Sequence, residues 1–266
     1  PEGEAGERAA RLLDEVYASA VATGTPIIVT DYATAELVKV SANAFLATKI
    51  SFINAMAEIA EVTGADVTKL ADAIGHDARI GRRFLNAGVG FGGGCLPKDI
   101  RAFSARAREL GVGESLQFLD EVDKINLRRR ARVVEMVREE AGRLEGVRVG
   151  VLGLAFKPHS DDVRDSPALE IAMRLAEAGA VVIATDPQAV ENARRRAPAL
   201  SFVETAEEAV RDADVVLLIT EWPEFTGLDP EALGELVAHR TVIDGRNSLN
   251  PAAWRAAGWA YRGLGR

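Results

Sequence analysis

The only cysteine of the chain lies in a run of residues whose types suit chemistry better than core packing. Cys95 follows five glycines between Gly88 and Gly94 and precedes a Leu-Pro-Lys-Asp segment. A glycine-rich backbone can approach a bound ligand closely and adopt positive φ angles. Lys98 and Asp99 can supply charge that activates a thiol or manages a proton. The alternative is a structural cysteine beside a flexible loop, because free cysteines are most often small buried hydrophobes.

A second group of polar residues lies on a long, mostly apolar segment. Residues 33–63 have the pattern of one helix that is apolar on nearly all sides, which predicts burial on more than one face. Lys39 and Asn43 are four apart and therefore neighbours on that helix, with Glu36 next to Lys39. A lysine there needs an anionic companion, which is Glu36, a substrate or a developing oxyanion. A lysine that is simply paired with Glu36 explains the pattern equally well.

The second half of the chain carries basic residues after predicted strands. Lys157 and Arg164 follow the first strand, close to a helix that begins at Ser166-Pro167. Because anions bind at the carboxyl edge of a parallel sheet and at helix N-termini, this placement favours a phosphorylated ligand. Asp186, after the second strand, is either a ribose-binding acid or a helix N-cap. Arg246 follows a later strand, and a surface turn is its alternative interpretation.

Composition limits the classes of protein that need consideration. The 266 residues are 48% hydrophobic and 27% charged, as expected of a soluble globular protein. A formal net charge of -8 gives no general attraction to nucleic acid. No apolar stretch reaches membrane-spanning length and the N-terminus has no signal-peptide pattern, so we expect a cytoplasmic protein without membrane contact. One cysteine and three scattered histidines predict no disulfide and no metal site.

The elements that must position these residues form two halves. The first is helical: it has helices at 7–21, 33–63, 66–74, 98–110 and 114–144, with one short strand at Ile27-Ile28-Val29. The second alternates strands at 147–152, 181–185, 214–220 and 241–244 with helices at 167–178 and 230–238. Such alternation predicts a Rossmann-like α/β sheet with parallel strands, in which the loop after the first strand lacks the third glycine of the dinucleotide fingerprint. The fold class is therefore α/β.

These pieces together resemble the UDP-glucose 6-dehydrogenases of the UDP-glucose/GDP-mannose dehydrogenase family. The likeness runs over nearly the whole chain. It rests on Thr34-Ala35-Glu36-Leu37-Val38-Lys39 with Asn43, on Gly90-Phe91-Gly92-Gly93-Gly94-Cys95-Leu96-Pro97-Lys98-Asp99, on Gly153-Leu154-Ala155-Phe156-Lys157, on Val163-Arg164-Asp165-Ser166-Pro167 and on Asp244-Gly245-Arg246. The resemblance implies oxidation of the C6 alcohol of UDP-glucose to a carboxylate in two steps that use NAD.

The resemblance also assigns roles to residues. Cys95 would be the nucleophile that forms a thiohemiacetal and then a thioester, Lys39 would stabilise oxyanions, and Asn43 and Asp99 would position water and assist proton transfer. The residues implied for substrate binding are Arg79, Asn86, Gly90, Phe91, Gly92, Phe156, Lys157 and Arg246, with Arg79 acting across a homodimer interface. Lys98 and Arg164 are implied for NAD binding.

The resemblance divides the chain into three parts. Residues 1–30 would be a remnant of an N-terminal NAD-binding domain, 31–145 a helical central and dimerisation domain with a long connecting helix, and 146–266 a UDP-sugar-binding Rossmann-like domain. The Gly-x-Gly-x-x-Gly loop of the family's first domain is not in this sequence. Asn54-Ala55 also stands where relatives commonly have Asn-Glu. We therefore expect that this polypeptide alone does not turn over.

Three other functions remain compatible with these residues. GDP-mannose 6-dehydrogenase fits the Leu-Pro-Lys-Asp segment, although the Gly-Phe-Gly-Gly run favours UDP-glucose. A non-catalytic module that binds a nucleotide sugar and dimerises would share the fold, and only the reactivity of Cys95 would separate it from an enzyme. A hydroxy-acid dehydrogenase would need no cysteine and is the most distant option.

Overall fold

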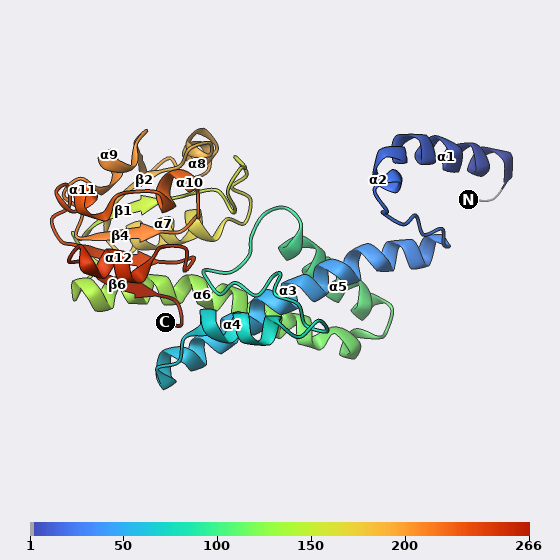
Figure 1. The fold of residues 1–266 in the computed structure, drawn as a ribbon, viewed down its shortest axis with the longest axis horizontal. Helices are drawn as coiled ribbons and strands as arrows, with labels where there is room; N and C mark the ends of the chain where they lie inside the picture. Colours follow the sequence, from blue (N-terminus) through green and yellow to red (C-terminus); the bar gives the residue numbers. More distant parts are fainter. Residues whose placement is uncertain (1–2) are drawn as a thin grey trace. The chain divides into compact units, whose positions relative to one another are not determined.

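The computed structural model describes residues 3–266, which contain a parallel sheet and a set of long helices (Figure 1). The helices are α1 (Gly3–Val16), α2 (Ala18–Ala22), α3 (Tyr32–Thr63), α4 (Val67–Gly75), α5 (Leu96–Glu109), the 3-10 turn η1 (Gly113–Leu116), α6 (Gln117–Ala141), α7 (Pro167–Glu177), α8 (Val190–Arg196), α9 (Ala206–Val210), α10 (Pro223–Thr226), α11 (Pro230–Gly234) and α12 (Pro251–Ala256). The strands are β1 (Arg148–Leu152), β2 (Val181–Thr185), β3 (Ser201–Phe202), β4 (Val215–Leu218), β5 (Thr241–Asp244) and β6 (Ala260–Gly263).

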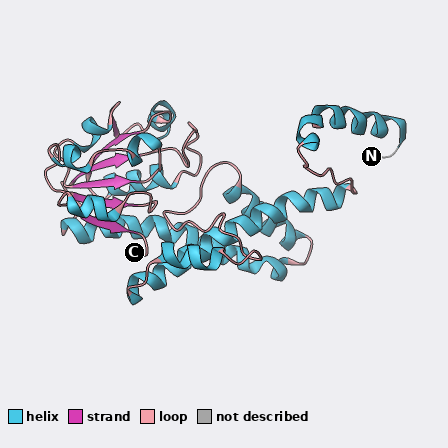
Figure 2. Cartoon of the chain, viewed as in Figure 1, coloured by secondary structure: helices cyan, strands magenta, loops and turns pink. Residues whose placement is uncertain are grey.

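The six strands form one sheet in the order β3-β2-β1-β4-β5-β6, and every neighbouring pair is parallel. Helices flank the sheet (Figure 2). The central strands β1 and β4 are continuous apolar runs because both of their faces are covered. The chain order changes direction between β1 and β4, and ligands of doubly wound folds bind beside the carboxyl ends of strands at such a point. The predicted α/β class with a parallel Rossmann-like sheet is confirmed.

Several helix ends follow from single residues. The Asp66 side chain accepts hydrogen bonds from the backbone N–H groups of Thr68 (2.8 Å) and Lys69 (3.4 Å), so α4 begins there as predicted. Ser166 caps α7 in the same way. Gly142 ends α6 in the left-handed conformation, with φ of 73°, which glycine adopts without strain.

Helix α6 packs against both halves of the molecule. Near its start, Leu119 and Val122 belong to a core with residues of α3 and α5. Farther along, Val133 and Met136 are buried in the core of the sheet, and α6 contacts α7, β4 and β5. A helix that is shared by two cores fixes how the loop before α5 faces the sheet. The domain limits at 30/31 and 145/146 stay predictions.

The chain divides into two compact units, of which the first ends at Ala42 and the second is Asn43–Arg266. In the first, Ile27-Ile28-Val29 forms no strand, and the side chains are exposed. The prediction of a strand was wrong because a β-strand needs hydrogen bonds from a neighbouring strand. In the described residues the strands that pair are those of the one sheet, which lies in the second unit.

Helix α3 spans Tyr32–Thr63 as predicted, but its burial differs from the expectation. Its buried positions in the second unit are mostly small, such as Ala47 and Ala57, whereas Phe45, Phe52 and Ile59 are 66%, 48% and 52% exposed. The expectation of burial on more than one face is therefore wrong for the single chain. The uncovered side chains recur at seven-residue intervals, which places them on one stripe of the helix. Among the described residues, no helix is both long and apolar enough to cross a membrane.

Candidate active site around Cys95

Cys95 stands immediately before α5, at the end of the segment Gly88–Cys95, which we call the cysteine loop. Its side chain is exposed, and its carbonyl oxygen accepts a hydrogen bond from the N–H of Asp99 (2.9 Å), which closes the first turn of the helix. Pro97 lies in that first turn, where its missing N–H costs nothing. The sequence thus places the thiol at a helix N-terminus beside a loop that is largely buried.

A cavity of about 430 Å³ opens beside Cys95. Its lining comes from five separate segments of the chain: α3, the cysteine loop with the residues next to it, and the turns after β1, β4 and β5. Of the residues predicted for the site, it is lined by Cys95, Asn86, Gly90, Phe91, Gly92, Phe156, Lys157, Arg164 and Arg246. The cavity thus brings together residues that are far apart in the sequence, from Ile50 on α3 to Arg246 after β5.

The cysteine loop is held by buried side-chain amides. The Oδ1 atom of Asn54 accepts from Gly88 N–H (2.8 Å). Asn126 on α6 accepts from Phe91 N–H (2.7 Å) and donates to Phe91 C=O (3.0 Å), so both backbone polar groups of Phe91 are hydrogen-bonded. Gly90 has φ of 93°, and any Cβ there would collide with the Asn126 side chain. The loop therefore has one well-defined path, and Gly90 is required both by its φ angle and by the close approach of α6.

Arg246 joins three segments at the cavity wall. Its guanidinium donates to the carbonyl oxygens of Ile219 (2.7 Å), Gly90 (3.1 Å) and Phe156 (3.2 Å), and its side chain is only 15% exposed. The Oε2 atom of Glu221 lies 3.2 Å from Nε of Arg246 but receives no hydrogen bond, because that N–H points to Ile219. Arg246 is therefore a largely buried side chain that links three segments, and the surface-turn interpretation does not describe it.

The turn that carries Arg246 depends on a buried carboxylate. Asp244 accepts hydrogen bonds from the N–H groups of Arg246 (3.1 Å) and Leu249 (2.7 Å) and from the hydroxyl of Tyr261 (3.0 Å). Burial raises the pKa of Asp244 above its usual value, although these donors act in the opposite direction. Burial and the nearby Asp244 raise the pKa of Tyr261 as well.

Two cationic side chains, Arg164 and Lys157, line the cavity. Asp162 binds the Arg164 guanidinium through two oxygens, at 3.0 Å from Nε and 2.8 Å from Nη2. This hydrogen-bonded pair raises the pKa of Arg164 and lowers that of Asp162. The Lys157 ammonium lies 5.5 Å from the centre of the Phe156 ring. These cations could receive an anionic ligand at the cavity mouth.

Asn43 and Asp99, two of the other predicted catalytic residues, meet at the first turn of α5. The Asn43 amide donates to Oδ2 of Asp99 (2.6 Å), and Oδ1 of Asp99 lies 3.3 Å from the ammonium of Lys98. Asp99 is 6% exposed, whereas Lys98 extends into solvent. Lys39 precedes Asn43 by one helical turn on α3 and belongs to the first compact unit. The structure thus brings Asn43, Asp99 and Lys98 together.

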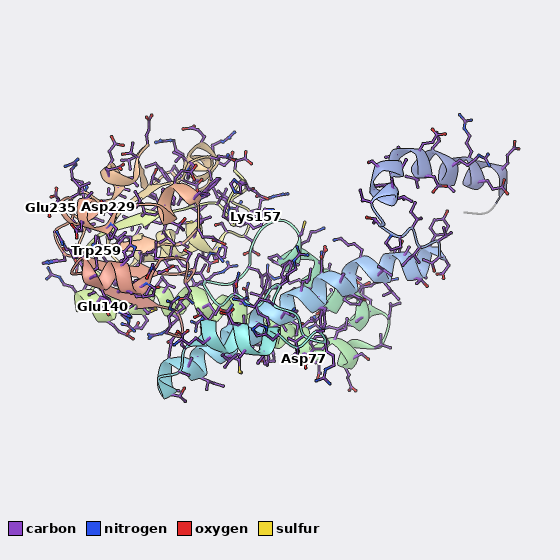
Figure 3. All side chains as sticks on the ribbon, viewed as in Figure 1. Asp77, Glu140, Lys157, Asp229, Glu235 and Trp259 are labelled. Carbon is purple, nitrogen blue, oxygen red and sulfur yellow. The ribbon has the colours of Figure 1, made fainter. Side chains whose placement is uncertain are left out.

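Arg79 does not line the cavity. It is exposed and paired with Asp77, with Nη2 2.6 Å from Oδ2. Asp77 lies well away from Lys157 in the second unit (Figure 3). The predicted contact between Arg79 and the substrate would therefore need a second copy of the chain.

Asp186 provides no ribose-binding carboxylate. Its Oδ2 accepts from the N–H groups of Leu154 (2.8 Å) and Ala155 (3.0 Å) and from the indole of Trp222 (3.0 Å). Its Oδ1 accepts from the N–H groups of Gln188 and Ala189. With five donors bound and 4% exposure, the carboxylate has no free lone pair for a ribose hydroxyl. This edge of the sheet does not fit a dinucleotide cofactor bound in the Rossmann manner.

Sequence reasoning missed several residues that shape the site. Glu221 and Asp162 line the cavity, and Asn126 and Arg130 hold the loop from α6. One signal was present: Asn126 and Arg130 are polar residues four apart on a helix that was predicted to connect the halves. Glu221 offered none, because a glutamate after a strand is common on surfaces.

Comparisons with known proteins identify the family. The family model "UDP-glucose/GDP-mannose dehydrogenase family, central domain" matches residues 33–128, and the model of the same family's UDP binding domain matches residues 150–251. This chain belongs to that family. The cavity beside Cys95 is lined from both matched ranges.

Individual relatives agree with this assignment. The chain is 40% identical over 265 residues to UDP-glucose 6-dehydrogenase TuaD of Bacillus subtilis, covering 99% of this chain and 56% of TuaD. It is 42% identical over 264 residues to UDP-glucose 6-dehydrogenase AglM of Haloferax volcanii, covering 98% and 59%. A solved UDP-glucose dehydrogenase from Pyrobaculum islandicum superimposes with a TM-score of 0.84 at 38% identity, covering 97% and 56%. The chain thus spans a little over half the length of these relatives.

Proposed function

We propose that this chain is the substrate-binding and thiol-bearing part of an NAD-dependent UDP-glucose 6-dehydrogenase. The observation that carries the proposal is the cavity in which the sole cysteine meets Lys157, Arg164 and Arg246. Relatives named UDP-glucose 6-dehydrogenase, matched over nearly the whole chain, support the same activity. The chain covers little more than half the length of those relatives, so the complete reaction is a proposal for this polypeptide.

In the proposed chemistry, Cys95 is the nucleophile that binds the reacting carbon covalently. The thiol sulfur adds to the aldehyde carbon of the half-oxidised sugar, and the resulting thiohemiacetal loses hydride to become a thioester. Water then cleaves the C–S bond, which releases the carboxylate and returns the thiol. NAD, when bound, accepts the two hydrides. We assign no NAD geometry, since Asp186 is fully bonded, and Lys98 and Arg164 remain the residues proposed to reach the cofactor.

The residues near Cys95 suit the remaining steps of this chemistry. The Asn43 amide fixes one oxygen of Asp99 at 2.6 Å, which would hold that carboxylate in place to orient water for thioester cleavage. Phe156, Lys157 and Arg246 would contact the UDP part, together with the loop from Asn86 to Gly92. Lys39 is proposed to stabilise oxyanions, and this assignment depends on the family resemblance.

We also propose that the chain works as a homodimer. The exposed stripe of Phe45, Phe52 and Ile59 on α3 is apolar surface that a second copy could cover. Arg79, which does not line the cavity of its own copy, would then be available to the cavity of the partner. The predicted cytoplasmic location stays a prediction.

The test is calorimetric titration of the chain with UDP-glucose and, separately, with GDP-mannose. We expect heat from UDP-glucose that is lost in Lys157→Ala and retained in Lys69→Ala, a control that removes an exposed lysine of α4 outside the cavity. Preferential binding of GDP-mannose would assign the chain to the sister activity. Absence of binding by either sugar nucleotide would contradict the proposed substrate site.

A matched experiment separates an enzyme part from a non-catalytic binding module. Cys95 is the only cysteine, so alkylation by iodoacetamide reports on it alone. We expect UDP-glucose to slow this alkylation, and Cys95→Ser to bind UDP-glucose normally, because the thiol acts on the sugar after binding. Binding that leaves the alkylation rate unchanged would favour the non-catalytic module.

A further inference from the structure

Asp165 lies where the cysteine loop, α5, α6 and the start of α7 meet. It has φ of 47°, a left-handed conformation that aspartate tolerates better than most residues, and it directly precedes Ser166, the N-cap of α7. Any Cβ on Gly92 would collide with the Asp165 carbonyl oxygen. The backbone of the cysteine loop is therefore in direct contact with this residue.

The Asp165 carboxylate is shared by two helices. Its Oδ2 accepts from Nη1 of Arg101 on α5 (3.0 Å), and its Oδ1 accepts from Nη1 of Arg130 on α6 (2.9 Å). Arg130 is fully buried, and its Nη2 donates to the carbonyl oxygen of Phe91 (3.2 Å) in the cysteine loop. One carboxylate thus links the turn before α7 to the helix that follows Cys95 and, through Arg130, to the loop that precedes it.

The neighbour of Asp165 faces Cys95. The carbonyl oxygen of Arg164 accepts from the N–H of Gly93 (2.9 Å), and a Cβ on Gly94 would lie 2.7 Å from the guanidinium carbon of Arg164. The side chain of Arg164 is 72% exposed and is bound by Asp162 of the same turn, so the pair moves with that turn if the backbone shifts. The position of this cation relative to the thiol therefore depends on how the turn at Asp165 is fixed.

The geometry points to Asp165 as a positioning residue, which holds the turn bearing Arg164 against the cysteine loop and so sets the cationic surroundings of Cys95. The consequence of this positioning for catalysis rests on the proposed function. Loss of the Asp165 charge would not leave a buried arginine without a carboxylate, because Arg101 also binds Asp123 and Arg130 also binds Glu170. The fold is therefore expected to survive, whereas the placement of Arg164 is not.

The variant Asp165→Asn tests this inference. Asparagine also tolerates the left-handed conformation, but its amide lacks the negative charge that binds both arginines. The matched control is Asp123→Asn, which removes the other carboxylate on Arg101 and leaves the contact with the turn before α7 intact. Both variants remove one carboxylate from Arg101, but only Asp165→Asn also removes a carboxylate from Arg130 and the link to the turn before α7.

The measurement is the ratio of Cys95 alkylation rates by iodoacetate, which is an anion, and by iodoacetamide, which is neutral. A cation held beside the thiol raises this ratio, whereas a general loosening of the fold speeds both reactions alike. We expect Asp165→Asn to lower the ratio about threefold, the scale of one partly exposed ion pair, and Asp123→Asn to leave it unchanged. An unchanged ratio in Asp165→Asn, or an equal fall in both variants, would overturn the inference.

Titrations with UDP and UDP-glucose keep this result separate from the proposed function. The alkylation ratio needs no substrate, so a wild-type chain that binds no UDP-glucose contradicts the substrate site while the ratio still decides the role of Asp165. Where the wild type binds both ligands, we expect Asp165→Asn to weaken UDP-glucose relative to UDP. Equal weakening of both would assign Asp165 to general stability and overturn a positioning role.

Discussion

The sheet and helix α3 are about equally apolar in sequence, yet the structure treats them differently. The central strands β1 and β4 bury all of their hydrophobic residues. Helix α3 buries small residues and leaves Phe45, Phe52 and Ile59 exposed. The difference teaches that the hydrophobic pattern of the sheet is satisfied within the chain, whereas that of α3 leaves three large apolar side chains uncovered, where we propose that a second copy binds.

The largest expected effect concerns the exposed side chains of α3. Phe45→Ser combined with Phe52→Ser should weaken the free energy of dimerisation of the proposed homodimer by about 3 kcal/mol or more, because buried aromatic side chains dominate interface energies. Light scattering over a range of protein concentrations measures the change. Phe118→Ser is the matched control, because Phe118 is 50% exposed but lies on α6, outside the α3 stripe. A wild-type chain that is monomeric at every concentration would contradict the comparison.

The next effect concerns the interior of the α/β sheet. Asp186→Ala leaves five donors without their acceptor and should lower the free energy of unfolding by about 3 kcal/mol. Urea denaturation followed by circular dichroism measures this loss. Asp161→Ala, which removes an exposed partner of Asn192, should change it by about 0.5 kcal/mol or less. Similar losses in both variants would show that Asp186 is no more important than a surface carboxylate.

A smaller effect appears in the pH dependence of stability. Burial raises the pKa of Asp244 in the folded state, so the native protein binds a proton more tightly than the unfolded chain. The stabilisation from this group is present below the unfolded pKa of about 4 and is lost as the pH rises through the folded pKa. The stability of the wild type relative to Asp244→Asn should therefore fall in urea titrations as the pH rises above about 4 and through the raised folded-state pKa. Parallel profiles would refute this.

The smallest effect belongs to the helical half. Asp66→Ala removes the N-cap of α4 and should cost about 1 kcal/mol at neutral pH. Burial acts to raise the pKa of Asp66, but the hydrogen bonds from Thr68 and Lys69 outweigh it and the pKa is lowered. The cost should therefore fade as the pH falls below about 4, through the folded pKa. Asp66→Asn keeps the acceptor and should retain most of the stability while it loses this pH dependence.

Much of the fold could be predicted because local patterns coincide with tertiary burial. Strands β2 and β5 begin and end where their apolar runs do, and Asp66 marks the start of α4. Many residues that line the cavity were also predicted from the sequence, but the prediction came from a family resemblance and not from their spacing. Their proximity depends on long-range contacts such as that between Arg246 and Gly90, which no local pattern encodes.

The failures have physical causes as well. Ile27-Ile28-Val29 has strand propensity, but a strand exists only where another strand pairs with it. The two-residue strand β3 and the edge strand β6 were missed because they are too short or too polar for an apolar run. The ribose-binding alternative for Asp186 could not be settled from sequence, because only the structure shows that five donors already surround it.

The glycines of the cysteine loop make it a poor place for variation. A methyl group at Gly88 would lie 2.7 Å from the Gly245 carbonyl oxygen, a rigid backbone atom, whereas at Gly93 and Gly94 it would meet the side chains of Phe156 and Arg164. A library of random substitutions should therefore recover alanine at position 94 far more often than at 88 or 92. Engineers who wish to alter which sugar the cavity accepts would do better to vary residues of the facing turns than the loop itself.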